Sequence, residues 1–302
     1  MRWMLMGLLL VVVGCGSVAV MEERVPGRSQ DAVSSPASFT AMSFNIRFGT
    51  ANDGANAWEH RREAVMGMIR RHDPDLLGVQ EALTFQVEEI KAAFPGYAFW
   101  GVGRDDGLEA GEYCGIFVKR ERFGIEEGGH LWLSEDPERP GSVGWDASMT
   151  RMASWVLVRA RRSGRAVVFG NTHFDHIGAE SRLASARLIR DRLVEVPSGT
   201  AFVLVGDFNA GEGSPPYLAL TTGDLPGNPA LVDAYRQAHP ERREGEGTYS
   251  AFRAEAVRDR RIDWVLHNPV LETVDCVIDY GLVDGVLASD HDPVVAELRW
   301  AE

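Results

Sequence analysis

Hydrophobic and polar positions along most of the chain follow two periods. Within residues 39–48 every second position from Met42 onwards is apolar, which predicts a strand. Other stretches place apolar residues three or four positions apart, which predicts helices over 58–71, from Thr84 as its cap, and from about Ala179. Short apolar runs predict further strands at 76–79, 97–102, 113–119, 155–161, 166–172, 202–205, 261–267, 270–278 and 294–300. Strands and helices therefore alternate, as in an α/β domain.

The first residues have a pattern of their own. Arg2 precedes an apolar run that ends before Gly14 and Cys15, and this run is long enough for a signal peptide but short for a membrane span. Val12-Val13-Gly14-Cys15 resembles the lipobox of bacterial lipoproteins, which implies cleavage before Cys15 and acylation of that residue. A plain membrane anchor that continues through residues 18–21 is the alternative. Both interpretations place the rest of the chain outside the cytoplasm.

Residues 16–38 contain several Pro, Gly and Ser and show no apolar period, which predicts a flexible tether. From 39 to 302 neither a repeat nor a linker interrupts the pattern. The expected order is therefore a signal peptide with its lipobox over 1–15, a tether over 16–38, and one folded domain over 39–302. We expect a monomer that its N-terminal lipid holds on a bacterial membrane, in the periplasm, on the outer membrane or at the cell surface.

The charge balance narrows the classes of partner. The chain has 44 acidic and 31 basic residues and a net charge of −13, whereas proteins that grip a nucleic-acid backbone usually present a basic stripe. Nucleic acid is therefore disfavoured as a partner, although a bound metal can invert the field around a few carboxylates. Hydrophobic residues make up 45 % of the chain, enough for a core. Within that core we expect Cys114 and Cys276 to be buried thiols.

Polar residues gather where predicted strands end. Asp207 and Asn209 follow the run 202–205, and their spacing of two puts both side chains on one side of the chain. Aspartate binds hard cations or accepts protons, and asparagine hydrogen-bonds phosphate or water; the alternative is an Asx turn that closes the strand. His173 and His176 follow another strand and suit metal binding, proton transfer or a plain polar loop.

Two further polar groups belong to the last third of the chain. Asp263 stands inside an apolar strand, where an unpaired charge costs several kcal/mol, roughly. A histidine is a natural partner for it, and the Asp290-His291 pair precedes the final strand. Asn45 and Glu81 complete the polar groups at strand ends.

The order of the polar blocks along the chain is more specific than any one of them. The blocks are Ser-Phe-Asn-Ile-Arg at 43–47, Gln-Glu at 80–81, Asn-Thr-His at 171–173, Gly-Asp-Phe-Asn at 206–209, Arg-Ile-Asp at 261–263 and Ser-Asp-His at 289–291. This order resembles the endonuclease/exonuclease/phosphatase superfamily over about residues 39–300. The resemblance implies an α/β fold of the deoxyribonuclease I type. In that fold, two packed mixed β-sheets flanked by helices form a four-layer sandwich, with the site where loops at one end converge.

The same resemblance implies roles for these residues. Glu81 is expected to be the main ligand of Mg²⁺ or Mn²⁺, with Asn45 beside it, because such hard cations take oxygen donors. Asp290 is expected to bind a second metal in the two-metal version of this chemistry. Asp207 and Asn209 are expected to position the attacking water and the scissile phosphate.

The remaining catalytic assignments concern two histidines. Asp263 is expected to pair with His291, so that the imidazole takes a proton or holds developing phosphate charge. His173 is expected across the phosphate, with Glu112 as its carboxylate partner.

Four residues are expected to contact the substrate. Arg104 and Arg151 suit phosphate recognition, or are ordinary surface charges. Trp145 lies in a loop rich in Gly and Pro and is expected to line the entrance, and His176 is assigned with them.

These observations predict a metal-dependent phosphoesterase that hydrolyses a small phosphoester, either a sugar phosphate or a lipid head group, by in-line attack of water. An extracellular nuclease is the alternative among enzymes; it needs a basic groove, and pairs such as Arg61-Arg62 are dispersed and typical of a solvated face. A non-catalytic binding module that keeps the fold is the alternative of another class.

Overall fold

The computed structural model describes residues 38–193, 195–197, 199–222, 230–255 and 258–302. The signal peptide, Cys15 and nearly all of the tether lie outside these residues and stay predictions. Ser38, which we predicted to end the tether, is instead the first residue of a strand and is buried. Among the described residues, no helix has both the length and the apolar character that a membrane span requires.

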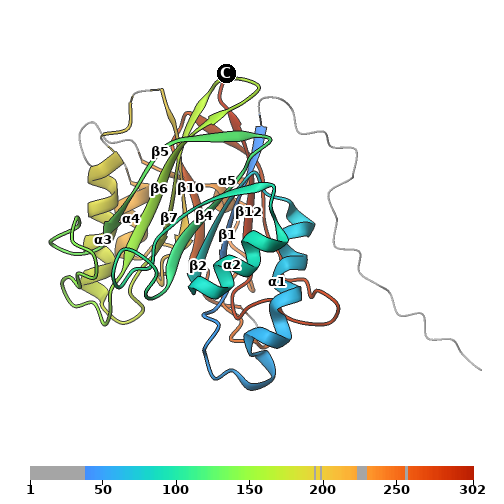
Figure 1. Cartoon of the computed structure of the whole chain (residues 1–302). Coiled ribbons are helices and arrows are strands. Elements are labelled where there is room, and N and C mark those ends of the chain that lie inside the picture. Colours follow the sequence, from blue (N-terminus) through green and yellow to red (C-terminus); the bar gives the residue numbers. More distant parts are fainter. Residues whose placement is uncertain (1–37, 194, 198, 223–229, 256–257) are drawn as a thin grey trace, which may run out of the picture. The chain divides into compact units, whose positions relative to one another are not determined.

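Two six-stranded sheets form the middle of the domain (Figure 1). The first sheet has the order β11 (Leu271–Ile278), β12 (Val294–Trp300), β1 (Ser38–Asn45), β2 (Leu76–Ala82), β4 (Tyr113–Lys119), β3 (Tyr97–Trp100). The second has the order β5 (Phe123–Trp132), β6 (Met152–Ala160), β7 (Ala166–His173), β8 (Ala201–Asp207), β10 (Asp263–His267), β9 (Val232–Asp233). Both are mixed, because β1 runs parallel to β2 and β7 to β8, and the other pairs are antiparallel.

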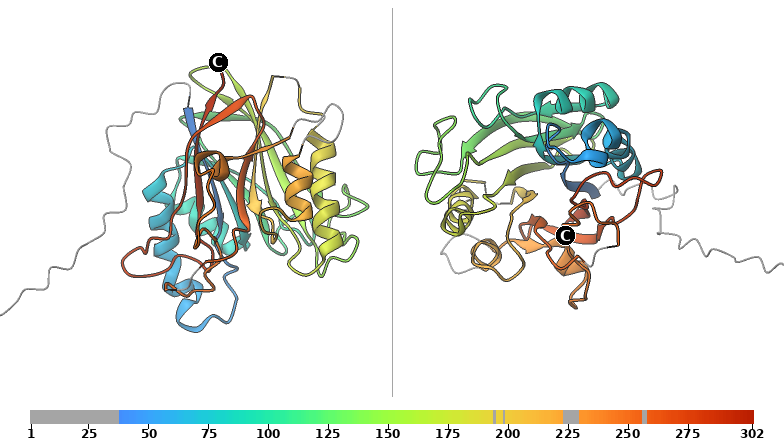
Figure 2. Two further views of the ribbon diagram at one scale, coloured as in Figure 1. Left: turned by 180° about the vertical axis from the view of Figure 1, so that it is seen from behind. Right: turned by 90° about the horizontal axis from the view of Figure 1, so that it is seen from below.

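Helices cover the outer faces of the two sheets. Figure 2 shows α1 (Trp58–His72) and α2 (Thr84–Ala93) on the side of the first sheet, and α3 (Ala179–Leu193) with α4 (Pro215–Thr221) on the side of the second. The short elements are η1 (Gly54–Asn56) and α5 (Ala234–Ala238). The four-layer sandwich predicted from the sequence is therefore confirmed.

The central strands carry apolar side chains along most of their length and polar side chains at one end. In β1, Phe39 and Ala41 belong to the apolar core between the sheets, whereas Met42 and Phe44 face the core under α1. The inward face of β1 then ends in Asn45. In the facing sheet, β7 and β8 end in His173 and Asp207, and the antiparallel strand β10 begins with Asp263. One end of the sandwich thus collects the polar groups, because all these strands bury their apolar part toward the other end.

Several local predictions need correction. Thr84 is the first residue of α2 rather than its cap, and its hydroxyl donates to the Glu109 carbonyl instead. The ten-residue strand β5 was not predicted, because its sequence Phe-Gly-Ile-Glu-Glu-Gly-Gly-His-Leu-Trp has no period of two. Cys114 and Cys276 are free and buried, as predicted.

Candidate active site

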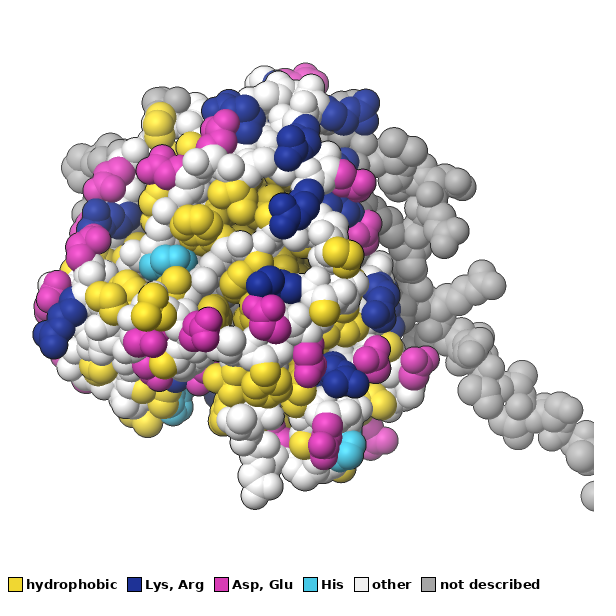
Figure 3. Space-filling model, viewed as in Figure 1, with side chains coloured by type: hydrophobic (Ala, Val, Ile, Leu, Met, Phe, Trp, Pro, Cys, Tyr) yellow, Lys and Arg dark blue, Asp and Glu magenta, His cyan; other side chains and the backbone are white. Residues whose placement is uncertain are grey.

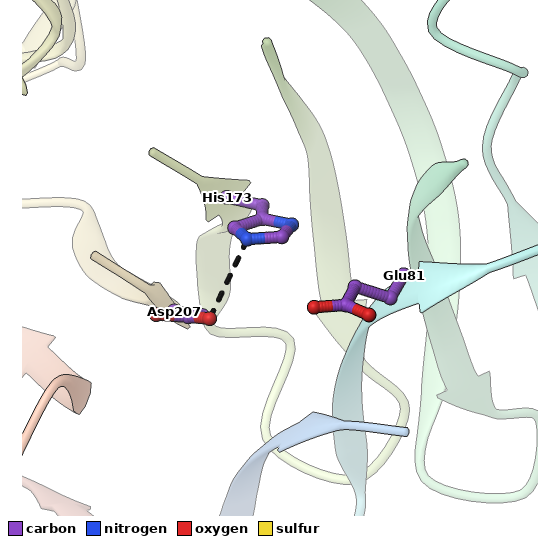
Figure 4. Close-up of side chains that lie close together, drawn as sticks. All are labelled: Glu81, His173 and Asp207. Carbon is purple, nitrogen blue, oxygen red and sulfur yellow. Dashed lines mark ion pairs between the residues drawn. The ribbon is translucent and has the colours of Figure 1, made fainter. Parts of the chain in front are cut away.

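Three side chains from three strands meet at the polar end of the sandwich. The amide nitrogen Nδ2 of Asn45 donates to Oε1 of Glu81 at 2.9 Å and to Oδ2 of Asp207 at 3.0 Å. Figure 4 shows Glu81 and His173 turned toward Asp207, and their potential ligand atoms lie within 4.8 Å of one another. Burial raises the pKa of Asp207 above its ordinary value, and the neighbouring carboxylates of Asp263 and Glu81 add to the effect of burial although His291 opposes it.

The backbone of β2 is distorted where it delivers Glu81. Residues 76, 78 and 80 point toward the facing sheet, so Glu81 in a regular strand would point away from the site. The register with β4 shifts between Val79 and Ala82, and Glu81 adopts a φ of +63°. A bulge of this kind re-aims a side chain, and a non-glycine residue in the left-handed region marks a strained, functional position.

The donor set fits a hard divalent cation. Glu81 and Asp207 supply carboxylate oxygen atoms, and the amide nitrogen of Asn45 bridges them. Asp290 adds a third carboxylate nearby, since Arg47 lies 3.9 Å from both Glu81 Oε2 and Asp290 Oδ2. Burial raises the pKa of Asp290, and Glu81 raises it further although His291 and Arg47 oppose this. Buried carboxylates that disfavour one another's charge are stabilised by a cation with oxygen ligands, such as Mg²⁺ or Mn²⁺.

A second group orients an imidazole. His291 Nδ1 lies 2.8 Å from Oδ2 of Asp263, and the Thr248 hydroxyl donates to the same oxygen at 2.5 Å. The other ring nitrogen, Nε2, faces Oδ2 of Asp207 at 3.7 Å. Burial opposes the charged form, but the carboxylates of Asp263 and Asp207 raise the pKa of His291 well above its usual value. These carboxylates thus favour the charged form of His291, whose free nitrogen points at the metal-binding group.

His173 has the opposite electrostatic character. Burial, followed by the charges of Arg151 and Arg104, lowers its pKa well below the usual value. Its Nε2 lies 3.1 Å from Nδ2 of Asn209, so the neutral ring accepts a hydrogen bond there. Asn209 itself has a φ of +48°. The site thus pairs one neutral histidine with one charged histidine across Asp207.

Most of these groups line one cleft of about 390 Å³, whereas Asn45, Thr248 and Asp263 do not reach its surface. The cleft is lined by Arg47, Phe48, Glu81, Glu112, Met149, Arg151, His173, His176, Asp207, Asn209, Tyr249, Arg260, Ile262, Asp290 and His291. The cleft brings together acid and base groups, the carboxylates of the metal-binding cluster and several arginine side chains. This arrangement is expected for hydrolysis of a phosphoester.

The family model described as "Endonuclease/Exonuclease/phosphatase family" matches residues 42–291, which include the whole cluster. The chain belongs to this family. Members of this family are hydrolases that act on phosphoester bonds, and they include nucleases.

Solved relatives resemble the chain over nearly all of their length. A mannosyl-6-phosphatase of Bacteroides thetaiotaomicron is 32 % identical, with a TM-score of 0.79 over 87 % of this chain and 100 % of that one. A family protein of Bacteroides vulgatus is also 32 % identical, with a TM-score of 0.80 over 88 % and 100 %. The exoribonuclease subunit Ccr4 of Emericella nidulans is 25 % identical over 170 residues, 48 % of this chain and 25 % of that protein. This chain spans about a quarter to a third of the first curated relatives that it matches.

One predicted pair of this phosphoesterase site is arranged differently. Glu112 was expected to hold His173, but Arg104 binds both oxygens of Glu112 at 2.7 and 2.9 Å, and His173 Nδ1 is 3.8 Å away. Arg104 is therefore neither a surface charge nor a group of the cleft lining; it neutralises Glu112 behind His173. Arg104 binds Glu112 more closely than His173 does, because the two donors of its guanidinium match the two oxygens of the carboxylate.

The other predicted substrate contacts separate into two classes. Arg151 and His176 line the cleft, and the Nη1 atom of Arg151 is buried without a hydrogen-bond partner among the described residues. Asp175 at 3.4 Å from Nε and His176 at 2.9 Å from Nη2 fix that guanidinium. Trp145 does not line the cleft: its backbone turns through a φ of +52° and is held by Glu135 instead.

Two arginines at or near the cleft, Arg61 and Arg260, were not predicted from the sequence. Arg61 was taken as part of a solvated pair, yet it is 1 % exposed and donates to the carbonyls of Ile46, Arg47 and Ala288 beside the metal-binding groups. Its spacing from Trp58, on the buried side of α1, is the signal that could have found it. Arg260 belongs to a loop without any period, where the sequence carries no such signal.

Proposed function

We propose that this chain is a divalent-metal-dependent phosphatase that hydrolyses a small sugar phosphate. The observation that carries the proposal is the cleft: a volume of about 390 Å³ suits one small ligand, and Arg47, Arg151 and Arg260 belong to its lining. The resemblance to a mannosyl-6-phosphatase over the full length of that protein supports the same substrate class.

Glu81, Asp207 and Asp290 would hold Mg²⁺ or Mn²⁺, and Asn45 hydrogen-bonds to the first two of them. When bound there, the cation supplies charge stabilisation for the phosphoryl and leaving oxygens. The fit rests on the oxygen-rich donors and on the raised pKa of the buried Asp290 described above.

The chain's own residues then divide the work around the phosphate. Asp207, whose pKa is raised by burial, accepts the proton of the attacking water, and Asn209 orients the phosphoryl group. His291, kept charged by Asp263, donates hydrogen bonds to the charge that develops on the phosphoryl oxygens. The unpaired Nη1 of Arg151 offers a further donor on the opposite wall.

A nucleic-acid substrate has less support. On the face shown in Figure 3, basic and acidic side chains are interspersed, and the net charge of −13 opposes an extended polyanion. The relatives named as exoribonucleases match about half of this chain. A solved TDP2 with a single-strand DNA product covers 87 % of this chain, but at only 16 % identity.

The proposal is tested with the full-length protein in detergent. Phosphate release is measured with Mg²⁺ or Mn²⁺ over hexose phosphates, methyl phosphate, a lipid phosphodiester and DNA. We expect release from the sugar phosphates that a chelator abolishes and that His291→Ala reduces at least about a hundredfold, since a positioned acid–base group contributes that much. His60→Ala, an exposed histidine of α1, is the matched control. Cleavage of DNA or of the lipid alone, or no metal-dependent turnover, would overturn the proposal.

We also propose that Cys15 carries the lipid that holds the enzyme on a bacterial membrane. Cys15→Ser should move the protein from the membrane fraction to the soluble fraction and remove the acyl mass from the N-terminal peptide. An unacylated N-terminus in the wild-type protein would refute this assignment.

A further inference from the structure

One wall of the cleft takes no part in the phosphate chemistry. Tyr249, Arg260 and Ile262 reach the cleft from the segment between α5 and β10, whereas the catalytic groups come from the strand ends and from the loop before β12. The wall therefore offers an aromatic ring, a guanidinium and an aliphatic side chain beside the position of the phosphate.

The position of Tyr249 is set by its buried neighbours. Thr248 and Ser250 are buried on either side of it. The amide of Ser250 donates to the Asp290 carbonyl at 2.7 Å, and the amide of Asp292 donates to the Thr248 carbonyl at 2.7 Å. With both flanking residues turned inward, the half-buried ring of Tyr249 faces the cleft and meets the ring of His291 edge-on at 5.1 Å. The ring thus occupies one place relative to the catalytic imidazole.

The backbone that follows is strained. Ala251 and Phe252 are consecutive residues with φ of +50° and +59°. Both residues lie in the left-handed region, which is unfavourable for them because neither is glycine. The loop keeps this conformation because the Ala251 amide donates to the Asp290 carbonyl at 3.2 Å and the Phe252 ring packs against Arg61 at 5.6 Å. Strain of this kind persists where placement of a side chain matters.

Arg260 differs from the other two arginines of the cleft. Arg47 is held by Asp53 at 3.0 Å, and Arg151 by Asp175. The exposed side chain of Arg260 makes neither an ion pair nor a hydrogen bond with the part of the chain that the structure describes, while its carbonyl accepts from the Thr248 amide at 2.8 Å. Its five donors are thus free for a ligand.

We propose that Tyr249, Arg260 and Ile262 form the subsite that binds the polyhydroxylated ring of the substrate. The C–H face of such a ring packs on an aromatic or aliphatic surface, and the rigid fork of an arginine donates to two adjacent hydroxyls. The inference rests on the proposed sugar phosphatase activity and adds the residues that select the sugar. A hexose phosphate and an inositol phosphate share this chemistry, so the substrates of the test separate them.

The experiment compares full-length wild type with Tyr249→Ala, Tyr249→Phe, Arg260→Ala and Arg260→Lys. Each is assayed on hexose 6-phosphates, inositol 1-phosphate and methyl phosphate, a monoester without a ring. Arg162→Ala, an exposed arginine in the turn between β6 and β7, is the matched control. Thermal unfolding of every variant verifies folding, and Arg260 is exposed, so its variants remain informative if Tyr249→Ala does not fold.

We expect the preference for the ring substrate, the ratio of its kcat/KM to that of methyl phosphate, to fall about tenfold in Tyr249→Ala and Arg260→Ala. The fall should come through KM, because the contacts lie away from the reacting atoms. Arg162→Ala should keep the wild-type preference. An unchanged preference in both Arg260→Ala and the folded Tyr249 variant overturns the subsite while the phosphatase stands. Turnover of none of these monoesters by wild type overturns both proposals.

Discussion

Replacement of Arg61 by methionine tests whether one buried side chain holds the metal-binding segments together. The guanidinium of Arg61 donates to four carbonyl groups at 2.6–3.0 Å: those of Asn56, Ile46, Arg47 and Ala288. Two of these, Ile46 and Arg47, directly follow Asn45 in sequence, and Ala288 precedes Asp290 by two residues. Arg61→Met keeps much of the side-chain volume and removes all four donors.

Two opposing contributions determine how far Arg61→Met lowers the free energy of unfolding. A hydrogen bond from a charged donor contributes about 1.5–3 kcal/mol, so four bonds contribute roughly 6–12 kcal/mol. Burial lowers the pKa of Arg61 to about 10, which corresponds to about 3 kcal/mol of opposing desolvation. Because water can replace part of the lost bonding, we expect the free energy of unfolding to fall by about 3–5 kcal/mol, as for other broken buried charge networks.

The assay is denaturant unfolding followed by tryptophan fluorescence, with and without Mg²⁺. Arg61→Lys keeps the charge but loses the planar fork, and should lie between wild type and Arg61→Met. Arg62→Met, the exposed neighbour, should change stability by no more than about 0.5 kcal/mol. The Mg²⁺ concentration that gives half of the stabilisation should rise in Arg61→Met alone. A loss within about 1 kcal/mol of the Arg62 control would refute the reasoning.

Three further outcomes are expected. Asp263→Asn should lower kcat about 10²–10⁴-fold, because His291 loses the carboxylate that lies 2.8 Å from its Nδ1 and favours its charged form. A loss of kcat below tenfold would contradict this role. Burial opposes ionisation of Asp279, but hydrogen bonds from two basic side chains of α1 hold its pKa well below the usual range. Its contribution to stability is therefore present above the ordinary aspartate pKa and is lost as pH falls below it. The difference in Tm between wild type and Asp279→Asn should be largest at pH 7 and shrink below about pH 4; a constant difference would be inconsistent with the linkage. Burial raises the pKa of Cys114 to about 12 and that of Cys276 well above its usual value. An alkylating reagent should therefore modify both thiols only after unfolding, as mapped by mass spectrometry. Rapid labelling of the folded protein would disprove their burial.

The sequence alone was sufficient for the fold class and for most of the elements. The alternation in β1 and the apolar run of β8 are local signals, and α1 and β4 begin at the predicted residues. The polar blocks at strand ends and their order were likewise visible in the sequence. Their convergence was inferred from resemblance, and the structure brings Asn45, Glu81 and Asp207 into hydrogen-bonding contact.

Tertiary structure decided the features that depend on competition between partners distant in the chain. Glu112 has both Arg104 and His173 within reach, and only the folded geometry shows that the arginine takes it. Arg61 carries the same charge as its solvated neighbour Arg62, yet the interior face of α1 places it among carbonyls. The spacing of apolar residues along one helix or strand places them on a single face, so the sequence determines which face of that element is buried. Which donor meets which acceptor depends on the packing of elements that are remote in sequence, and no local pattern records it.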